Sequence, residues 1–311
     1  MLHLLDICFD SSCRLTRRRY CFEYRSVQFK LVQSNSRKWA DHLLTIIPKD
    51  DMVAYQRAFS KAAEFVSALA WEIGARATLW EAGQRGWPKE HSLKQAEPSI
   101  FTPPRIRFSG GVGGYDLTRI AHVETEQQRV ALALFREASA SNNDYLSFLF
   151  YWQILETRGN DPVGFINKTF RKCRSQLRLD ARYIAQLPLA GRPLGQYLLD
   201  DCRHAIAHIR RRPGKKNLDL DQPSERLRLT LSSRVIAAFA RYYIREVLGL
   251  KNTLHLVQRK RGDIPVYADR KLLADRSYRP VPPKYWRPSQ KLLGKSGGGN
   301  TVIRGEKGPG F

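Results

Sequence analysis

Apolar residues recur at helical spacing through most of the middle of the chain. They fall three or four positions apart across residues 125–138, 162–188 and 224–248, which gives a helix one buried face. Residues 145–156 are apolar nearly all round, a pattern typical of a central helix buried on several sides. Together with a further helical segment at residues 193–209, these patterns predict a bundle of helices joined by short connections.

The first third of the chain mixes the patterns of strands and helices. Residues 26–32 alternate as a half-buried strand does. Residues 52–73 have helical spacing, and Asp50 and Asp51 precede them, where carboxylates favour the start of a helix. This part of the sequence therefore predicts a small α+β unit.

The residues that follow this helix give weaker signals. Gly74 allows a break, after which one or two further helical turns are expected up to about Ala82. Residues 84–116 are rich in proline and glycine and are expected to form loops. A new helical series begins near residue 119, so we place a domain boundary there.

Three parts are expected along the chain. Residues 1–118 form an N-terminal α+β accessory region, and residues 119–250 form the helical bundle. Residues 251–311 are basic, rich in proline and glycine and without a helical core pattern, so we expect a largely disordered tail.

The charge of the chain favours a polyanionic partner. Lys and Arg number 53 against 29 Asp and Glu, and the formal net charge is +24. Such a field attracts nucleic acid or an acidic membrane surface without sequence preference. A genome that favours arginine, combined with a basic tail, would give the same charge, so composition alone does not identify the partner.

Cysteine usage and hydropathy indicate the compartment. The five cysteines include no Cys-x2-Cys pair, so neither a zinc ribbon nor a disulfide framework is indicated. The N-terminus lacks a signal-peptide pattern, and the longest apolar stretch has about 11 residues where a membrane span needs about 20. We expect a cytoplasmic protein that does not enter a membrane.

Candidate chemistry is concentrated in residues 200–208, Asp-Asp-Cys-Arg-His-Ala-Ile-Ala-His. Arg203 and His208 are five residues apart, which on a regular α-helix places them about 140° apart around the axis. For both side chains to act at one place, the helix must end or distort there, or two copies of the chain must share a site.

The order Arg, a polar residue, three small or apolar residues and His resembles the Arg-x4-His signature of the HEPN superfamily. The order of elements over residues 120–250 is similar to that of HEPN-like proteins related to methylamine-utilisation protein J. The resemblance implies a mainly α fold: an HEPN-like helical bundle with an N-terminal α+β extension and a disordered basic tail. It also implies a bend near the motif and a homodimer.

The same resemblance implies a metal-independent endoribonuclease with Arg203 and His208 as catalytic residues and His204 in the polar position of the motif. A histidine moves protons to or from the 2′-OH and the departing 5′-oxygen, and an arginine stabilises charge on the phosphate. We expect no cofactor and no metal. Glu156 and Asp200 are the supporting carboxylates. A cationic run that follows the motif is expected to contact RNA phosphates: Arg210, Arg211, Arg212, Lys215 and Lys216.

Two other interpretations compete with this one. His204 and His208 share a helix face with Asp200, the spacing of a helical metal site, but Ala205 stands where metalloproteases carry their glutamate. Alternatively, the motif helix is a dimer or partner interface in a non-catalytic scaffold or accessory protein. The favoured hypothesis is a ribonuclease acting as a toxin or defence component, with RNA as substrate and a cognate antitoxin or other protein as partner.

Overall fold

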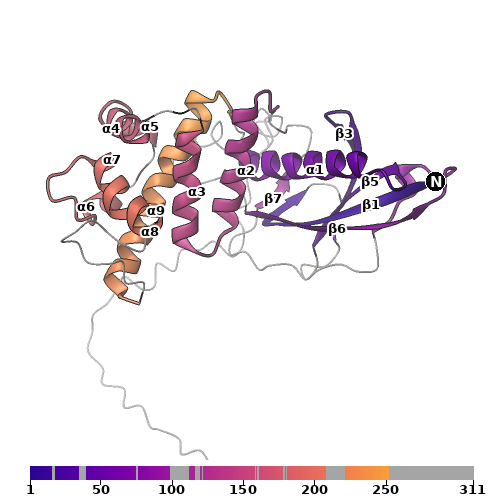
Figure 1. Cartoon of the computed structure of the whole chain (residues 1–311), viewed down its shortest axis with the longest axis horizontal. Coiled ribbons are helices and arrows are strands. Elements are labelled where there is room, and N and C mark those ends of the chain that lie inside the picture. Colours follow the sequence, from indigo (N-terminus) through magenta and orange to yellow (C-terminus); the bar gives the residue numbers. More distant parts are fainter. Residues whose placement is uncertain are drawn as a thin grey trace, which may run out of the picture.

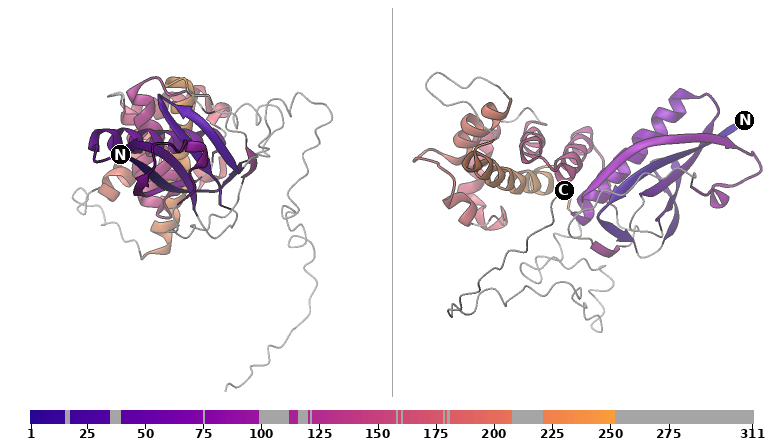
Figure 2. Two further views of the ribbon diagram at one scale, coloured as in Figure 1. Left: turned by 90° about the vertical axis from the view of Figure 1, so that its right-hand side faces the viewer. Right: turned by 90° about the horizontal axis from the view of Figure 1, so that it is seen from below.

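The protein consists of an antiparallel sheet with one long helix on it, followed by a group of helices at the end of the sheet (Figure 1). The right-hand view of Figure 2 shows the strands and the later helices at opposite ends of the molecule. This computed structural model describes residues 1–15, 18–34, 40–74, 76–98, 112–115, 120, 122–157, 159, 161–177, 179, 181–207 and 221–251.

The expectation of a mainly α, HEPN-like helical bundle is wrong for the chain as a whole. Its N-terminal part holds a five-stranded sheet with the strand order β3-β4-β5-β1-β6, and a separate parallel pair joins β2 to β7. The architecture is therefore α+β, with helices gathered at one end of an antiparallel sheet. The strands are β1 (Leu2–Ser11), β2 (Cys13–Leu15), β3 (Arg19–Tyr24), β4 (Val27–Val32), β5 (Asp41–Pro48), β6 (Ala77–Trp87) and β7 (Val112–Tyr115).

The central strand β1 explains why the sheet was underestimated. It pairs with β5 on one side and β6 on the other, and residues 4–11 are buried on both faces. Its apolar residues Leu5, Ile7 and Phe9 alternate with polar residues that are buried as well, so its sequence lacks the continuous apolar run typical of a strand buried on both faces. The expected strand at residues 26–32 is confirmed as β4, whose partly exposed start keeps that alternation.

The helix α1 (Met52–Ile73) begins and ends where the sequence indicated. The side chain of Asp51 accepts a hydrogen bond from the amide of Ala54 at 2.8 Å. Gly74 ends the helix in the left-handed conformation, at a φ of 59°. The expected helical continuation to Ala82 is wrong, because the chain reverses after Gly74 and β6 pairs with β1.

Two faces of α1 are buried. One face, including Phe65 and Leu69, packs against the sheet residues Leu5, Ile7 and Phe9. The other packs against the helices through Trp71. The helix α1 therefore contributes side chains to both the core of the sheet and the core of the helices.

The expected helices of the second half are confirmed. Segment 125–138 is α2 (Glu126–Ala140), 145–156 is α3 (Asp144–Glu156), and 224–248 is α9 (Pro223–Tyr242) followed by the π-helical turn η4 (Tyr243–Val247). Segment 162–188 is broken, as expected, into α4 (Pro162–Lys172), α5 (Arg174–Leu177) and α6 (Ala181–Ala185).

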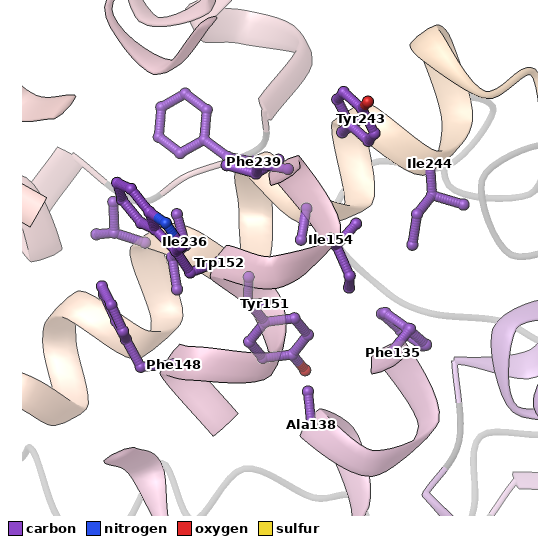
Figure 3. Close-up of a cluster of buried hydrophobic side chains, with 14 of the residues drawn as sticks. Phe135, Ala138, Phe148, Tyr151, Trp152, Ile154, Ile236, Phe239, Tyr243 and Ile244 are labelled. Carbon is purple, nitrogen blue, oxygen red and sulfur yellow. The ribbon is translucent and has the colours of Figure 1, made fainter. Parts of the chain in front are cut away.

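The helical core is built around α3, which has buried residues on several sides (Figure 3). Trp152 and Phe148 of α3 stack with ring centroids 6.1 Å apart. Phe239 of α9 and Tyr243 of η4 belong to the same buried cluster. The nearly uniform apolar pattern of residues 145–156 thus corresponds to a central helix.

Within the described residues, no helix is both long and apolar enough to cross a bilayer. The compartment of the protein and its division near residues 118 and 250 stay predictions. The expected disordered tail lies outside the described residues, apart from Lys251.

We expect Trp71→Ala to lower the free energy of unfolding by about 3–5 kcal/mol, because it leaves a cavity between α1 and α2. The Trp71 ring stands edge-on to that of Phe135 in α2, at 5.1 Å between centroids. Urea denaturation measures the loss. Val53→Ala on the same helix, where the residue is 76% exposed, is the control and should change stability by less than about 0.5 kcal/mol. Equal effects of the two variants would contradict the contribution of α1 to both cores.

Candidate functional site

The helix that carries the candidate motif changes pitch within the motif. It runs from α7 (Leu194–Tyr197) through the π-helical turn η3 (Leu198–Arg203) into α8 (His204–Ala207). At the end of η3 the amide of His204 donates to the carbonyl of Leu199, five residues earlier. The helix is therefore distorted up to Arg203, while residues 204–207 are α-helical and His208 lies outside the described residues. Single π-helical turns are frequent at functional sites because they reorient the side chains that follow.

Arg228 of α9 forms hydrogen bonds with the π-helical turn η3 and with Tyr197 just before it. Its guanidinium donates to the carbonyl oxygen of Asp201 at 2.9 Å and to the hydroxyl of Tyr197 at 3.3 Å. Glu225 accepts a further bond from it at 2.7 Å. Burial alone would lower the pKa of Arg228, but the bonds to Glu225 and Tyr197 more than offset it and raise the pKa. A fixed cation therefore satisfies a backbone carbonyl within η3.

Cys202 and Tyr197 face the interior of this region and are structural. The thiol of Cys202 donates to the Ser232 hydroxyl at 3.3 Å, and burial raises its pKa. Burial also raises the pKa of Tyr197 to about 12. Both groups stay protonated near neutral pH, which excludes Cys202 as a nucleophile there.

The start of the motif helix is held against α4. The amide of Gly195 donates to the side-chain carbonyl of Asn167 at 2.8 Å. A Cβ at position 195 would lie 2.6 Å from the carbonyl oxygen of Val163, so a larger residue there would force the helices apart. This close approach fixes α7, and hence η3, relative to the bundle.

Arg203 and Glu156 meet at the surface between η3 and α3. The guanidinium Nη2 of Arg203 lies 3.9 Å from Oε1 of Glu156, and the two side chains are 32% and 40% exposed. The indole of Trp152 donates to the same carboxylate oxygen at 2.7 Å, which orients Glu156. Arg203 thus lies near a carboxylate while about one third of its side chain stays exposed.

His204 and Asp200 form a second pair one turn apart. Nδ1 of His204 lies 3.9 Å from Oδ1 of Asp200, while the Gln196 amide donates to the other carboxylate oxygen at 2.8 Å. Asp201 points elsewhere and is paired with Arg192. Of the two adjacent carboxylates, Asp200 is therefore the one associated with the motif histidine.

Four of the predicted site residues fall within the described part of the chain: Arg203, His204, Glu156 and Asp200. The structure groups them into two pairs, whose roles in catalysis stay predictions. The others lie outside the described residues: His208, Arg210, Arg211, Arg212, Lys215 and Lys216.

Arg228 and Trp152 were not among the predicted site residues. A signal for Arg228 exists in the sequence, because it continues the buried stripe of Ser232, Val235 and Phe239 at helical spacing. A charged residue in line with the buried positions of a helix is expected to form an ion pair or hydrogen bonds inside the protein. No pattern in the sequence identifies the bond of Trp152 to Glu156, since an indole on a helix is ordinarily a core residue.

Residues 131–245 match the family model described as methylamine utilization protein MauJ. The match runs from α2 into η4 and includes both side-chain pairs and Arg228. The resemblance to methylamine-utilisation protein J is thus confirmed over this segment. Searches of curated proteins and of solved structures found no match to the chain.

We expect Arg228→Gln to destabilise the protein by about 1–3 kcal/mol, because it removes a charged hydrogen bond from a partly buried carbonyl and breaks the ion pair with Glu225. Hydrogen exchange should rise most at the amides of η3 and α8. Arg226→Gln, at an exposed position on the same helix, is the control. Unchanged exchange in η3 would show that Arg228 does not hold the turn.

Proposed function

We propose that this protein is a metal-independent endoribonuclease of HEPN type that uses Arg203 and His208. The observation that carries the proposal is the Arg203 guanidinium, which lies 3.9 Å from the Glu156 carboxylate and is about one third exposed. A guanidinium in this state can bind a phosphate diester through its free N–H groups. The match of residues 131–245 to the MauJ model supports the proposal because it covers this site.

The proposed reaction is attack of the RNA 2′-OH on the adjacent phosphorus. His208 removes the 2′-OH proton or protonates the departing 5′-oxygen, and Arg203 stabilises the charge that develops on the phosphoryl oxygens. The P–O5′ bond breaks as the P–O2′ bond forms. The products are a 2′,3′-cyclic phosphate and a 5′-hydroxyl, and no metal ion takes part.

His204 is the second candidate for proton transfer. Its ring lies beside Asp200 and is partly exposed. In the proposed site His204 either completes the acid–base pair with His208 or binds the phosphate as a cation.

The proposal includes a homodimer and RNA as the substrate. On a regular α-helix two residues five positions apart, such as Arg203 and His208, would lie about 140° apart around the axis, so a second copy is the simplest source of the opposing group. The net charge of +24 favours association with RNA. A toxin or defence role, with an antitoxin or other protein that restrains the site, is part of the same proposal.

We expect the wild type to cleave labelled RNA in excess EDTA and to leave 2′,3′-cyclic ends, and Arg203→Ala and His208→Ala to abolish cleavage. Arg226→Ala, which removes an exposed positive charge outside the site, should retain it.

Circular dichroism on the same samples checks that each variant is folded, and analytical ultracentrifugation checks the dimer. Cleavage by both site variants at the wild-type rate would overturn the assignment. A folded dimer that never cleaves would instead favour the non-catalytic interface.

We expect Glu156→Gln to lower kcat for RNA cleavage by about 10- to 100-fold with little change in KM, because it loosens the orientation of Arg203. Glu137→Gln on α2, an exposed glutamate paired with Arg136, is the control. A loss seen only in KM would assign Glu156 to substrate binding rather than to positioning.

A further inference from the structure

A second cluster of reactive side chains lies in the sheet, far along the chain from the motif. Cys8 of β1 and His42 of β5 are direct cross-strand partners, and Asp6 stands two residues before Cys8. Alternation along the strands puts all three on the face opposite to Leu5 and Ile7, which pack on α1. The two strands lie side by side in Figure 1.

The three side chains converge on one buried point. Nδ1 of His42 lies 2.7 Å from Oδ1 of Asp6 and 3.5 Å from Sγ of Cys8. The three potential ligand atoms all lie within 4.8 Å of one another. Asp6, Cys8 and His42 are only 2%, 5% and 3% exposed.

His42 lies at the centre of the arrangement. Nδ1 of an imidazole carries either one hydrogen or one lone pair, so it makes one strong hydrogen bond. It nevertheless faces both the carboxylate of Asp6 and the sulfur of Cys8. The cluster therefore brings a nitrogen, an oxygen and a sulfur atom, all able to bind a metal ion, together at one buried point.

We propose that Asp6, Cys8 and His42 bind one Zn²⁺ ion. Nitrogen, sulfur and oxygen donors from one residue each are ligands that zinc accepts. Zinc would displace the thiol proton, and its two positive charges would balance the thiolate and the carboxylate.

The distances suit a tetrahedral ion. With zinc bonds of about 2.0–2.3 Å, a sulfur and a nitrogen ligand lie about 3.6 Å apart, and a nitrogen and an oxygen ligand about 3.3 Å apart. The Cys8–His42 separation of 3.5 Å already matches. The His42–Asp6 pair must open by about 0.6 Å, a shift that rotation of the carboxylate supplies. A water molecule completes the fourth position.

The same face of the sheet carries other buried polar groups, which shows that it is not built as a simple apolar core. The ammonium of Lys30 donates to the carbonyl oxygens of Lys94, at 2.9 Å, and Ala96. The segment around η1 (Leu93–Gln95) therefore covers part of this face. A buried ion here would join the central strand β1 to β5 and act on the stability of the sheet.

A nucleophilic Cys-His-Asp site is the chemical alternative, and the structure opposes it. A thiol whose pKa is about 12 supplies little thiolate at neutral pH. Its near-complete burial also denies a substrate access to the sulfur. A structural metal ion needs neither an open site nor a free thiolate in advance.

Titration of metal-free protein with Co²⁺ tests the proposal. We expect one equivalent to bind with a sulfur-to-cobalt charge-transfer band in the near ultraviolet, and zinc to displace the cobalt. Cys8→Ser should lose the band, and His42→Gln should weaken zinc binding at least tenfold. Cys21→Ser, at an exposed cysteine outside the cluster, is the matched control and should keep both.

Zinc should also raise the Tm of the wild type and of Cys21→Ser but not of His42→Gln. Absence of cobalt binding by the folded wild type, or an unchanged band in Cys8→Ser, would overturn the proposal. If Cys8→Ser does not fold, X-ray absorption at the zinc edge of the wild type decides. One sulfur with nitrogen or oxygen ligands supports the site, and any other number of sulfurs overturns it.

Discussion

The helix α1 must remove two of its faces from water, and the arrangement of the whole molecule depends on that requirement. Phe65 and Leu69 on one side cover the sheet, while Trp71 on another meets Phe135 of the helical half. Because one rigid helix serves both cores, neither half can shift without exposing apolar surface of the other. Packing of α2 and α3 between α1 and the motif helix therefore fixes the position of the motif helix relative to the sheet.

Local signals in the sequence were sufficient to predict the positions of most helices in the second half of the chain. Helical spacing of apolar residues located α2 and α9, a nearly uniform apolar pattern located α3, and Asp51 caps the helix that it was expected to start. These features act over a few residues, so a sequence contains them directly. The placement of Arg203 beside Glu156 was expected from a resemblance, since residues 47 positions apart carry no local signal of their contact.

The sheet and the Asp6–Cys8–His42 cluster depend on pairing between strands that are far apart in the sequence. The polar residues of β1 alternate with Leu5, Ile7 and Phe9 and yet are buried, so the sequence does not indicate that the strand is central, and β6 becomes a strand because it pairs with β1. The cluster of Asp6, Cys8 and His42 exists only in the register that sets Cys8 opposite His42. A shift of that register by one residue would send one strand's side chains to the other face.

The wide turn η3 also bears on how this segment compares among relatives. A π-helical turn holds one residue more than the α-helical turn that would fill the same length. Loss of one residue from positions 198–203 would let the helix close with ordinary pitch and would leave the segments before and after the turn in place, so that the residues within the turn, including Arg203, would change position. Chain length across η3, and not only the identity of the motif residues, therefore determines which side chain stands beside Glu156. Among proteins that match residues 131–245, an alignment that places a gap in this turn marks a different surface even where the arginine and the histidine are both retained.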